Sequence, residues 1–228
     1  MNDVYYETRY VAFLDILGFK NMVEQSTESQ DILNQINDAL NYTNKVQHDN
    51  YHGFLPQVEF GKQVTTFSDS IVISYNTSTP GGGFHVLLDL VHISINLLDI
   101  GILVRGGVTV GQLIHKEQKY FGPAINKAYN MELNEAIFPR IVIDENVLNF
   151  DLENPGPANT VKFEEKFLTD LIKTDSNDDN KLRLAITIKP KMLHIKLFHC
   201  LYIFIRHSGL LIFTFEFCPF LFKFLFFI

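Results

Sequence analysis

RYVAFLDILGF, residues 9–19, is the stretch that decides how this chain folds. Its first part is short and almost wholly apolar, a pattern that predicts a strand over Arg9–Ile16 buried on both faces. Gly18 interrupts the apolar run, and a helix is predicted to begin at Phe19. Asp15 lies near the end of the strand, where a carboxylate is costly unless it is paired or binds a cation.

Helix and strand patterns follow this stretch at short intervals. The predicted elements are helices over 19–25 and 31–46, a β-hairpin over 58–75 with Ser68 and Asp69 in its turn, a helix over 84–98, a strand over 102–113, a helix over 124–136 and a strand over 141–143. Residues 144–189 are charged and less regular, which indicates a peripheral strand or helix and a loop. This order predicts an α+β fold, with helices packed on one face of a mainly antiparallel sheet.

Two groups of glycines stand out. The strand over 102–113 carries Gly106, Gly107 and Gly111, and glycine weakens a strand unless another part of the chain must come close to its backbone. Gly81–Gly83 lies between a strand and a helix, as a phosphate-binding loop does. No Lys-Ser or Lys-Thr pair follows it, so a flexible connector is the favoured interpretation.

The chain is acidic, because 19 basic and 26 acidic residues give it a net charge of −7 at pH 7. No basic block is present to neutralise phosphates, which excludes nucleic acid as the main partner. The two cysteines, Cys200 and Cys218, both lie near the C-terminus, which excludes a disulfide framework and a cysteine zinc site. The polar N-terminus shows no secretory signal, so a cytoplasmic location is expected.

Residues 192–228 differ in composition from the rest and hold nearly half of the chain's 21 phenylalanines. Charges interrupt their apolar runs well before the roughly 18–20 residues that span a bilayer. We therefore predict one domain over residues 1–189 and an atypical tail over 190–228. A shifted reading frame is the favoured explanation of the tail, and a membrane-associating hairpin is the alternative.

Asp15 and Asp69 are acids in apolar surroundings. If their strands are neighbours, both carboxylates emerge at the same sheet edge, where hard oxygen ligands and substrate phosphates favour Mg²⁺ or Mn²⁺. The alternative is that each carboxylate caps backbone amides. The glycine turn before the first helix also predicts that the amides of residues 17–19 bind phosphate. Glu132 and Glu135 are interpreted as part of a solvated helix face.

Four motifs carry a resemblance to a known family: FLDILGF (13–19), TFSDSIV (66–72), RGGVTVG (105–111) and FGPAINKA (121–128). Together they resemble the four signature stretches of class III nucleotidyl cyclases over roughly residues 8–145. They are most similar to the bacterial pyrimidine cyclases of the Pycsar antiphage systems, and PRIVID (139–144) adds to this similarity. The resemblance implies a ferredoxin-like fold, a nucleoside triphosphate substrate, and a homodimer whose active sites are shared across the interface.

The resemblance also implies which residues bind metal and substrate. Two divalent ions, Mn²⁺ or Mg²⁺, would be held by two carboxylates and one backbone carbonyl, those of Asp15, Asp69 and Ile16. The β- and γ-phosphates would be held by the amides of three successive residues, Leu17, Gly18 and Phe19. Phe13 shares a strand face with Asp15 and would contact the nucleotide. A core role for Phe13 is an equally good interpretation.

The implied reaction is attack of the ribose 3′-hydroxyl on the α-phosphorus, with release of pyrophosphate. In purine cyclases the last helix of the motif set carries an Asn and, four residues later, an Arg that stabilises the transition state. Asn126 matches the first position, but Asn130 stands at the second, and a neutral amide cannot supply the charge. Arg105, Lys119 and Lys127 are the candidates to replace it. The predicted catalytic residues are Asp15, Asp69, Asn126 and Arg105.

Thr65 and Lys119 correspond to the two base-selecting positions and match neither the adenine pair nor the guanine pair. Both can hydrogen-bond the carbonyls of a pyrimidine, and uracil is slightly favoured over cytosine. We therefore expect a uridylate cyclase whose product, 3′,5′-cyclic UMP, activates a separate effector in antiphage defence. The alternatives are a cytidylate cyclase and a catalytically silent nucleotide-binding module, which the missing arginine favours.

Overall fold

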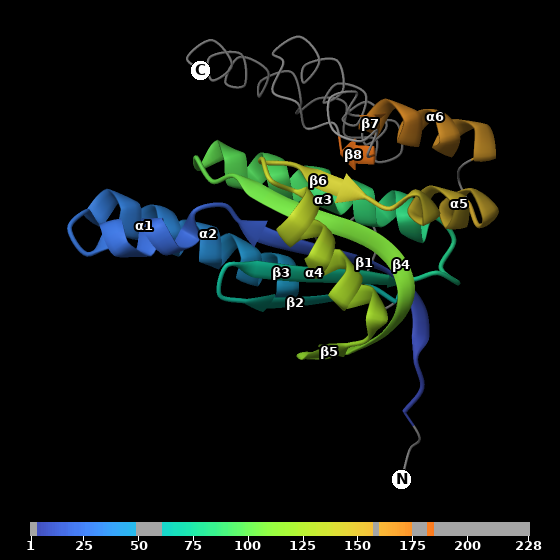
Figure 1. The fold of residues 1–228 in the computed structure, drawn as a ribbon, viewed down its shortest axis with the longest axis horizontal. Helices are drawn as coiled ribbons and strands as arrows, with labels where there is room; N and C mark the ends of the chain where they lie inside the picture. Colours follow the sequence, from blue (N-terminus) through green and yellow to red (C-terminus); the bar gives the residue numbers. More distant parts are fainter. Residues whose placement is uncertain (1–3, 49–60, 157–159, 175–181, 185–228) are drawn as a thin grey trace, which may run out of the picture. The chain divides into compact units, whose positions relative to one another are not determined.

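The computed structural model describes residues 4–48, 61–156, 160–174 and 182–184 (Figure 1). In chain order, the elements are β1 (Glu7–Ile16), α1 (Phe19–Ser26), α2 (Gln30–His48), β2 (Gln63–Phe67), β3 (Ser70–Asn76), α3 (Gly82–Asp99), β4 (Val104–Lys116), β5 (Lys119–Phe121), α4 (Pro123–Glu135), β6 (Ile141–Ile143), α5 (Glu145–Glu153), α6 (Val161–Leu171), β7 (Ile172–Thr174) and β8 (Leu182–Leu184). The predicted α+β class is confirmed. The less regular region after residue 144 holds two helices and a short strand pair.

The strands form one sheet in the order β2–β3–β1–β4–β6–β8–β7, and β5 pairs with β4 as a short hairpin (Figure 1). β1 lies between β3 and β4 and is antiparallel to both. β4 and β6 are parallel, while the other described pairs are antiparallel. The prediction of a mainly antiparallel sheet is therefore confirmed.

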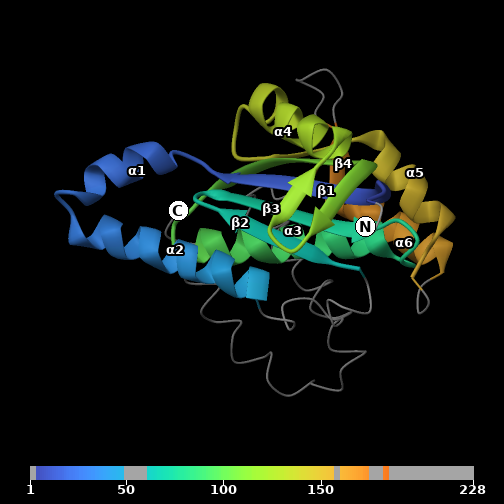
Figure 2. The same cartoon turned by 90° about the horizontal axis from the view of Figure 1, so that it is seen from below.

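Helices cover both faces of the sheet, with α4 on one side and α2 and α3 on the other (Figure 2). Val11 and Phe13 share a core cluster with Ala128 of α4. Tyr10 points to the opposite face by strand alternation, and a Cβ atom at Gly82 in α3 would lie 2.9 Å from its ring. The expectation that helices pack on one face is wrong, because β1 is apolar at odd and even positions and both of its faces need cover.

The glycines of β4 lie where other parts of the backbone come close. A Cβ atom at Gly107 would overlap the carbonyl oxygen of Ala128 and lie 2.7 Å from the Cβ of Met131, so α4 packs directly on the strand backbone. A Cβ atom at Gly106 would lie 2.5 Å from the carbonyl oxygen of Phe13 in β1. The expected close approach to this strand is confirmed.

The Gly81–Gly83 segment is tightly packed, and Gly83 lies against Asp151 of α5. The amide of Phe84 donates to Asp151 Oδ1 at 2.9 Å, and a Cβ atom at Gly83 would lie 2.6 Å from that oxygen. A carboxyl group of the protein itself therefore occupies the start of α3, where a phosphate-binding loop would hold its anion. The segment is neither a phosphate loop nor the flexible connector that we expected.

The tail predicted over residues 190–228, with both cysteines, lies outside the described residues. The tail and the domain boundary at residue 189 stay predictions. Among the helices of the described ranges, none combines the length and the apolar character that crossing a membrane requires.

Candidate active site

The sheet brings Asp15 and Asp69 to one end, although they are far apart in the chain. β1 and β3 are antiparallel, with Asp15 opposite Ser70, the residue that follows Asp69. The amide of Ile16 donates to the carbonyl oxygen of Asp69 at 3.1 Å, which ties the end of β1 to the β2–β3 turn. Ser68 has a φ of 54° in this two-residue turn.

The surroundings of Asp15 disfavour its negative charge. Burial raises the pKa of this carboxyl, and the charge of Asp69 raises it further, while Arg105 and Ser70 act in the opposite direction. Arg105 Nη2 lies 3.7 Å from Asp15 Oδ2, and Ser70 Oγ lies 3.5 Å from Oδ1. The negative charges of Asp15 and Asp69 are close to each other, and the guanidinium of Arg105 is too far away to neutralise them. A bound cation would therefore stabilise the ionised carboxylates.

Glu132 of α4 belongs to the same cluster, and our interpretation of it as a solvated residue is wrong. It is 2% exposed, and its Oε1 contacts Arg105 Nε in an ion pair rather than an aligned hydrogen bond. Burial raises the pKa of Glu132, Arg105 lowers it, and the charges of Asp15 and Asp69 raise it again. The sequence contained an indication of this burial, because residue 132 lies on the same helix face as the apolar residues 124 and 128, which precede it at four-residue intervals.

The N-terminus of α1 lies directly after Asp15. Gly18 precedes the helix with a φ of 78°, a conformation that glycine adopts without strain, and the first-turn amides have no acceptor within the helix. The amide of Leu17, however, donates to the carbonyl oxygen of Leu103 at 2.8 Å. The expected phosphate cradle is therefore narrowed to the amides of Gly18 and Phe19.

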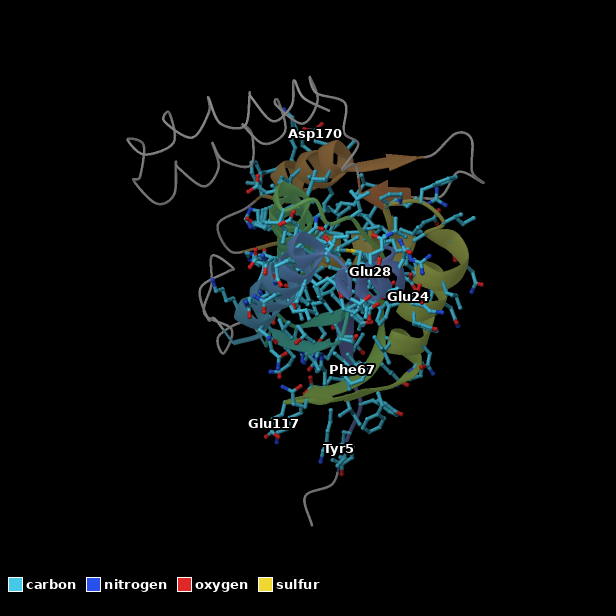
Figure 3. The ribbon with its side chains drawn as sticks, turned by 90° about the vertical axis from the view of Figure 1, so that its left-hand side faces the viewer. Tyr5, Glu24, Glu28, Phe67, Glu117 and Asp170 are labelled. Atoms are coloured by element: carbon cyan, nitrogen blue, oxygen red, sulfur yellow. The ribbon has the colours of Figure 1, made fainter. Side chains whose placement is uncertain are left out.

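Thr65 is buried in a chain of hydrogen bonds. Its hydroxyl donates to the Glu117 carbonyl oxygen at 2.9 Å and lies 3.0 Å from His115 Nε2, while Ser74 Oγ lies 2.8 Å from His115 Nδ1. Burial, and then the positive charge of Arg9, lowers the pKa of His115 to about 3, so the ring is neutral near pH 7. Glu117 lies at the outer end of the β4–β5 hairpin (Figure 3). Because the only hydroxyl proton of Thr65 is used within the protein, its expected role as a donor to the base is not supported.

Phe13 is 8% exposed, and its ring packs edge-on against Tyr129 with 5.3 Å between the ring centres. The core interpretation of Phe13 agrees with this position, and its contact with a nucleotide stays a prediction. Asn126 and Asn130 are both exposed on α4.

The three cations proposed to replace the missing arginine have different surroundings. Lys119 is exposed on β5, and Lys127 forms an ion pair with Asp144. Arg105 is the one of the three that reaches Asp15. Its position therefore makes Arg105 the favoured candidate to replace the missing arginine.

The donor set at this sheet end suits a hard cation. In the described part of the chain no three His, Cys, Asp or Glu side chains converge on a metal position. Two carboxylates and the Ile16 carbonyl nevertheless fit Mg²⁺ or Mn²⁺, which are commonly bound by one or two carboxylates with substrate phosphates and water in the remaining positions. Asp15, Asp69 and Ile16 thus remain candidate ligands.

A second polar region lies between α2 and α3, and none of its residues belongs to this site. It is a pocket lined by Tyr42, Val46, Lys62, Asp89, His92, Ile93 and Asn96. Lys62 Nζ and Asp89 Oδ2 form a buried ion pair at 2.7 Å, and the Tyr75 hydroxyl donates to the same oxygen at 2.7 Å. These groups satisfy one another, which indicates a structural role.

No family model and no curated protein matches the chain. Among solved structures, it is similar to the monomeric guanylyl cyclase domain of the RhoGC fusion protein from the aquatic fungus Blastocladiella emersonii, with a TM-score of 0.54 and 16% identity over 80% of this chain and 96% of that one. The adenylyl cyclase CyaB from P. aeruginosa has a TM-score of 0.49 and 13% identity over 78% of this chain and 92% of its own. The adenylate/guanylate cyclase/hydrolase from Silicibacter pomeroyi has a TM-score of 0.46 and 13% identity over 79% of this chain and 96% of its own. At such identities the first similarity establishes the fold alone: the chain has the fold of the class III nucleotidyl cyclases.

Proposed function

We propose that this protein is a nucleotidyl cyclase that converts UTP into 3′,5′-cyclic UMP and pyrophosphate in the cytoplasm. The observation that carries the proposal is the meeting of Asp15 and Asp69 at one sheet end, beside the start of α1 and the guanidinium of Arg105. Carboxylates for cations, amides for phosphate oxygens and a guanidinium for developing charge are the parts that phosphoryl transfer uses. The cyclase fold supports the same reaction class.

Each residue has a distinct task in this proposal. Asp15, Asp69 and the carbonyl of Ile16 would hold two divalent cations. Bound Mg²⁺ or Mn²⁺ would supply positive charge for the triphosphate and lower the pKa of the 3′-hydroxyl. The first-turn amides of α1 orient the terminal phosphates. Arg105 stabilises charge on the transferring phosphoryl group in place of the arginine that is absent at Asn130.

A pyrimidine substrate is supported by the departure of positions 65 and 119 from both purine pairs. With the Thr65 hydroxyl engaged inside the protein, Lys119 is the remaining donor of this pair, and its ammonium group suits a uracil carbonyl. The antiphage role, with a separate effector that responds to the product, follows the same resemblance. CTP is the alternative substrate.

A homodimer with shared active sites is also part of the proposal. Apolar side chains gather on the exposed side of α4 and in the loop after it: Tyr129, Leu133, Ile137 and Phe138. Their exposed fractions run from 46% to 66%. Such a group of exposed apolar residues supports association with a second copy.

The test is to incubate the purified full chain with each of the four nucleoside triphosphates and Mn²⁺. We expect cyclic UMP and pyrophosphate from UTP, detected by mass spectrometry, and a loss of at least about 100-fold in Asp69→Asn. Asp38→Asn, a change at an exposed acid of α2, is the matched control and should keep full activity. A purine product would contradict the substrate, and full activity of Asp69→Asn would remove Asp69 from the site.

The second candidate is a catalytically silent nucleotide-binding module, which the neutral Asn130 favours. Tight binding of a nucleoside triphosphate without pyrophosphate release would support it. Turnover in the same assay would exclude it.

A further inference from the structure

Glu132 is an interior carboxylate to which the proposed function gives no task. It is 2% exposed and lies where α4 packs on β4, since a Cβ atom at Gly107 would be 3.2 Å from its amide nitrogen. Its Oε1 contacts Arg105 Nε. A buried charge without a partner is costly, so each of these two groups holds the other in place.

Arg105 stands between carboxylates that come from different elements. Its Nε contacts Glu132 on α4, whereas its Nη2 lies 3.7 Å from Asp15 Oδ2 on β1, which is too long for a hydrogen bond. One guanidinium thus lies between two carboxylates, those of Asp15 and Glu132. A divalent cation at Asp15 would compete with Arg105 for the same oxygen atoms.

We propose that Glu132 is a positioning residue that retains Arg105 while a divalent cation occupies Asp15. The closer contact with Glu132 leaves the Asp15 oxygens to the cation and keeps the guanidinium beside them. Without the carboxylate of Glu132, Arg105 pairs with Asp15 and opposes cation binding. This inference rests on the proposed function and adds to it a residue that touches neither the cation nor the substrate.

The test is a double-mutant cycle in which Mn²⁺ binding to the full chain is measured by calorimetry without nucleotide. Glu132→Gln is expected to weaken Mn²⁺ binding about tenfold when Arg105 is present, because the guanidinium then pairs with Asp15. In the Arg105→Gln background the same change should have less than about a twofold effect. Glu135→Gln, a change on the same helix, is the matched control and should bind Mn²⁺ as the wild type does.

Equal weakening by Glu132→Gln in both backgrounds would overturn the inference, since the effect would then be one of charge alone. An unchanged affinity in Glu132→Gln would also overturn it. Thermal melting of every variant separates loss of folding from loss of binding. If Glu132→Gln does not fold, Arg105→Lys is used in its place. Lysine keeps the positive charge but lacks the Nε atom that contacts Glu132. Arg105→Lys should therefore weaken Mn²⁺ binding by a similar factor.

Asp69→Asn distinguishes the inference from the function on which it rests. If the wild type binds no Mn²⁺, or Asp69→Asn binds it equally well, the proposed function fails together with the inference. If Asp69→Asn loses Mn²⁺ binding while the cycle is additive, the inference alone fails.

Discussion

The carboxyl group of Asp151 is buried beside the start of α3, and its ionisation opposes folding. Burial, and then the negative charge of Glu164 on α6, raises the pKa of Asp151 to about 7, although the amides of Phe84 and Gly83 act against this shift. Tyr10 of β1 faces the same carboxyls, and burial and their negative charges raise the pKa of its hydroxyl. Asp151 is therefore neutral in the folded protein below about pH 7.

The negative charge of Glu153 also raises the pKa of the Tyr10 hydroxyl. An unfolded aspartate ionises near pH 3.9, so between that pH and about 7 the unfolded chain has lost a proton that the folded chain keeps. The free energy of unfolding then falls as the pH rises, by about 1.4 kcal/mol per pH unit. The total loss is about 4 kcal/mol at pH 7, with no further loss above it.

We predict that Asp151→Asn removes this pH dependence. Asparagine keeps an acceptor oxygen for the Phe84 amide and cannot ionise. Urea unfolding followed by circular dichroism, from pH 5 to pH 8, measures the free energy of unfolding of both proteins. The stability of Asp151→Asn relative to the wild type should increase by about 1.4 kcal/mol per pH unit up to about pH 7 and then level off.

Asp38→Asn, at an exposed site, is the control and should parallel the wild type over the whole pH range. Parallel curves for Asp151→Asn and the wild type would refute the reasoning. If the parallel curves also showed that Asp151→Asn is less stable by the same amount at every pH, Asp151 would stabilise the fold as an ionised group.

Three further changes test the packing and the buried polar groups by urea unfolding. Gly107→Ala should lower the free energy of unfolding by about 1–3 kcal/mol, because the new methyl group overlaps the Ala128 carbonyl oxygen and displaces α4; a fully stable variant would contradict this packing. Asp89→Ala should cost about 3–5 kcal/mol, because it leaves Lys62 buried without its charge partner, and a second change, Lys62→Met, should recover much of the loss. Thr65→Val should cost about 1–2 kcal/mol and leave the preferred nucleotide unchanged, whereas a switch of substrate would restore a base-reading role for this residue.

Local patterns explain which parts of the fold could be predicted. The Arg9–Ile16 strand, the turn at Ser68 and Asp69, and the strand at 141–143 are each specified by neighbouring residues, and the structure has them where expected. The glycines of β4 predicted a close approach but not its partner, since α4 reaches them only after the chain has turned back over the sheet. The helix positions on both faces were missed for the same reason.

In the candidate site, too, some residues could be predicted from the sequence and others could not. Asp15 and Asp69 could be singled out because a carboxylate among apolar neighbours is visible in any short window of sequence. The apolar row of its helix gave one indication that Glu132 is buried. Its pairing with Arg105, a residue of another element, and the closeness of α4 to the backbone at Gly107 could not be predicted.

The amino-acid sequence by itself determines the order of strands and helices and the two acids at strand ends, since periodicity and turn chemistry act over a few residues. Only the tertiary structure decides which charges are buried, which donors are already used and which carboxylates share one guanidinium. Those properties depend on atoms that the chain brings together from distant elements, where water is excluded and each unpaired charge is costly.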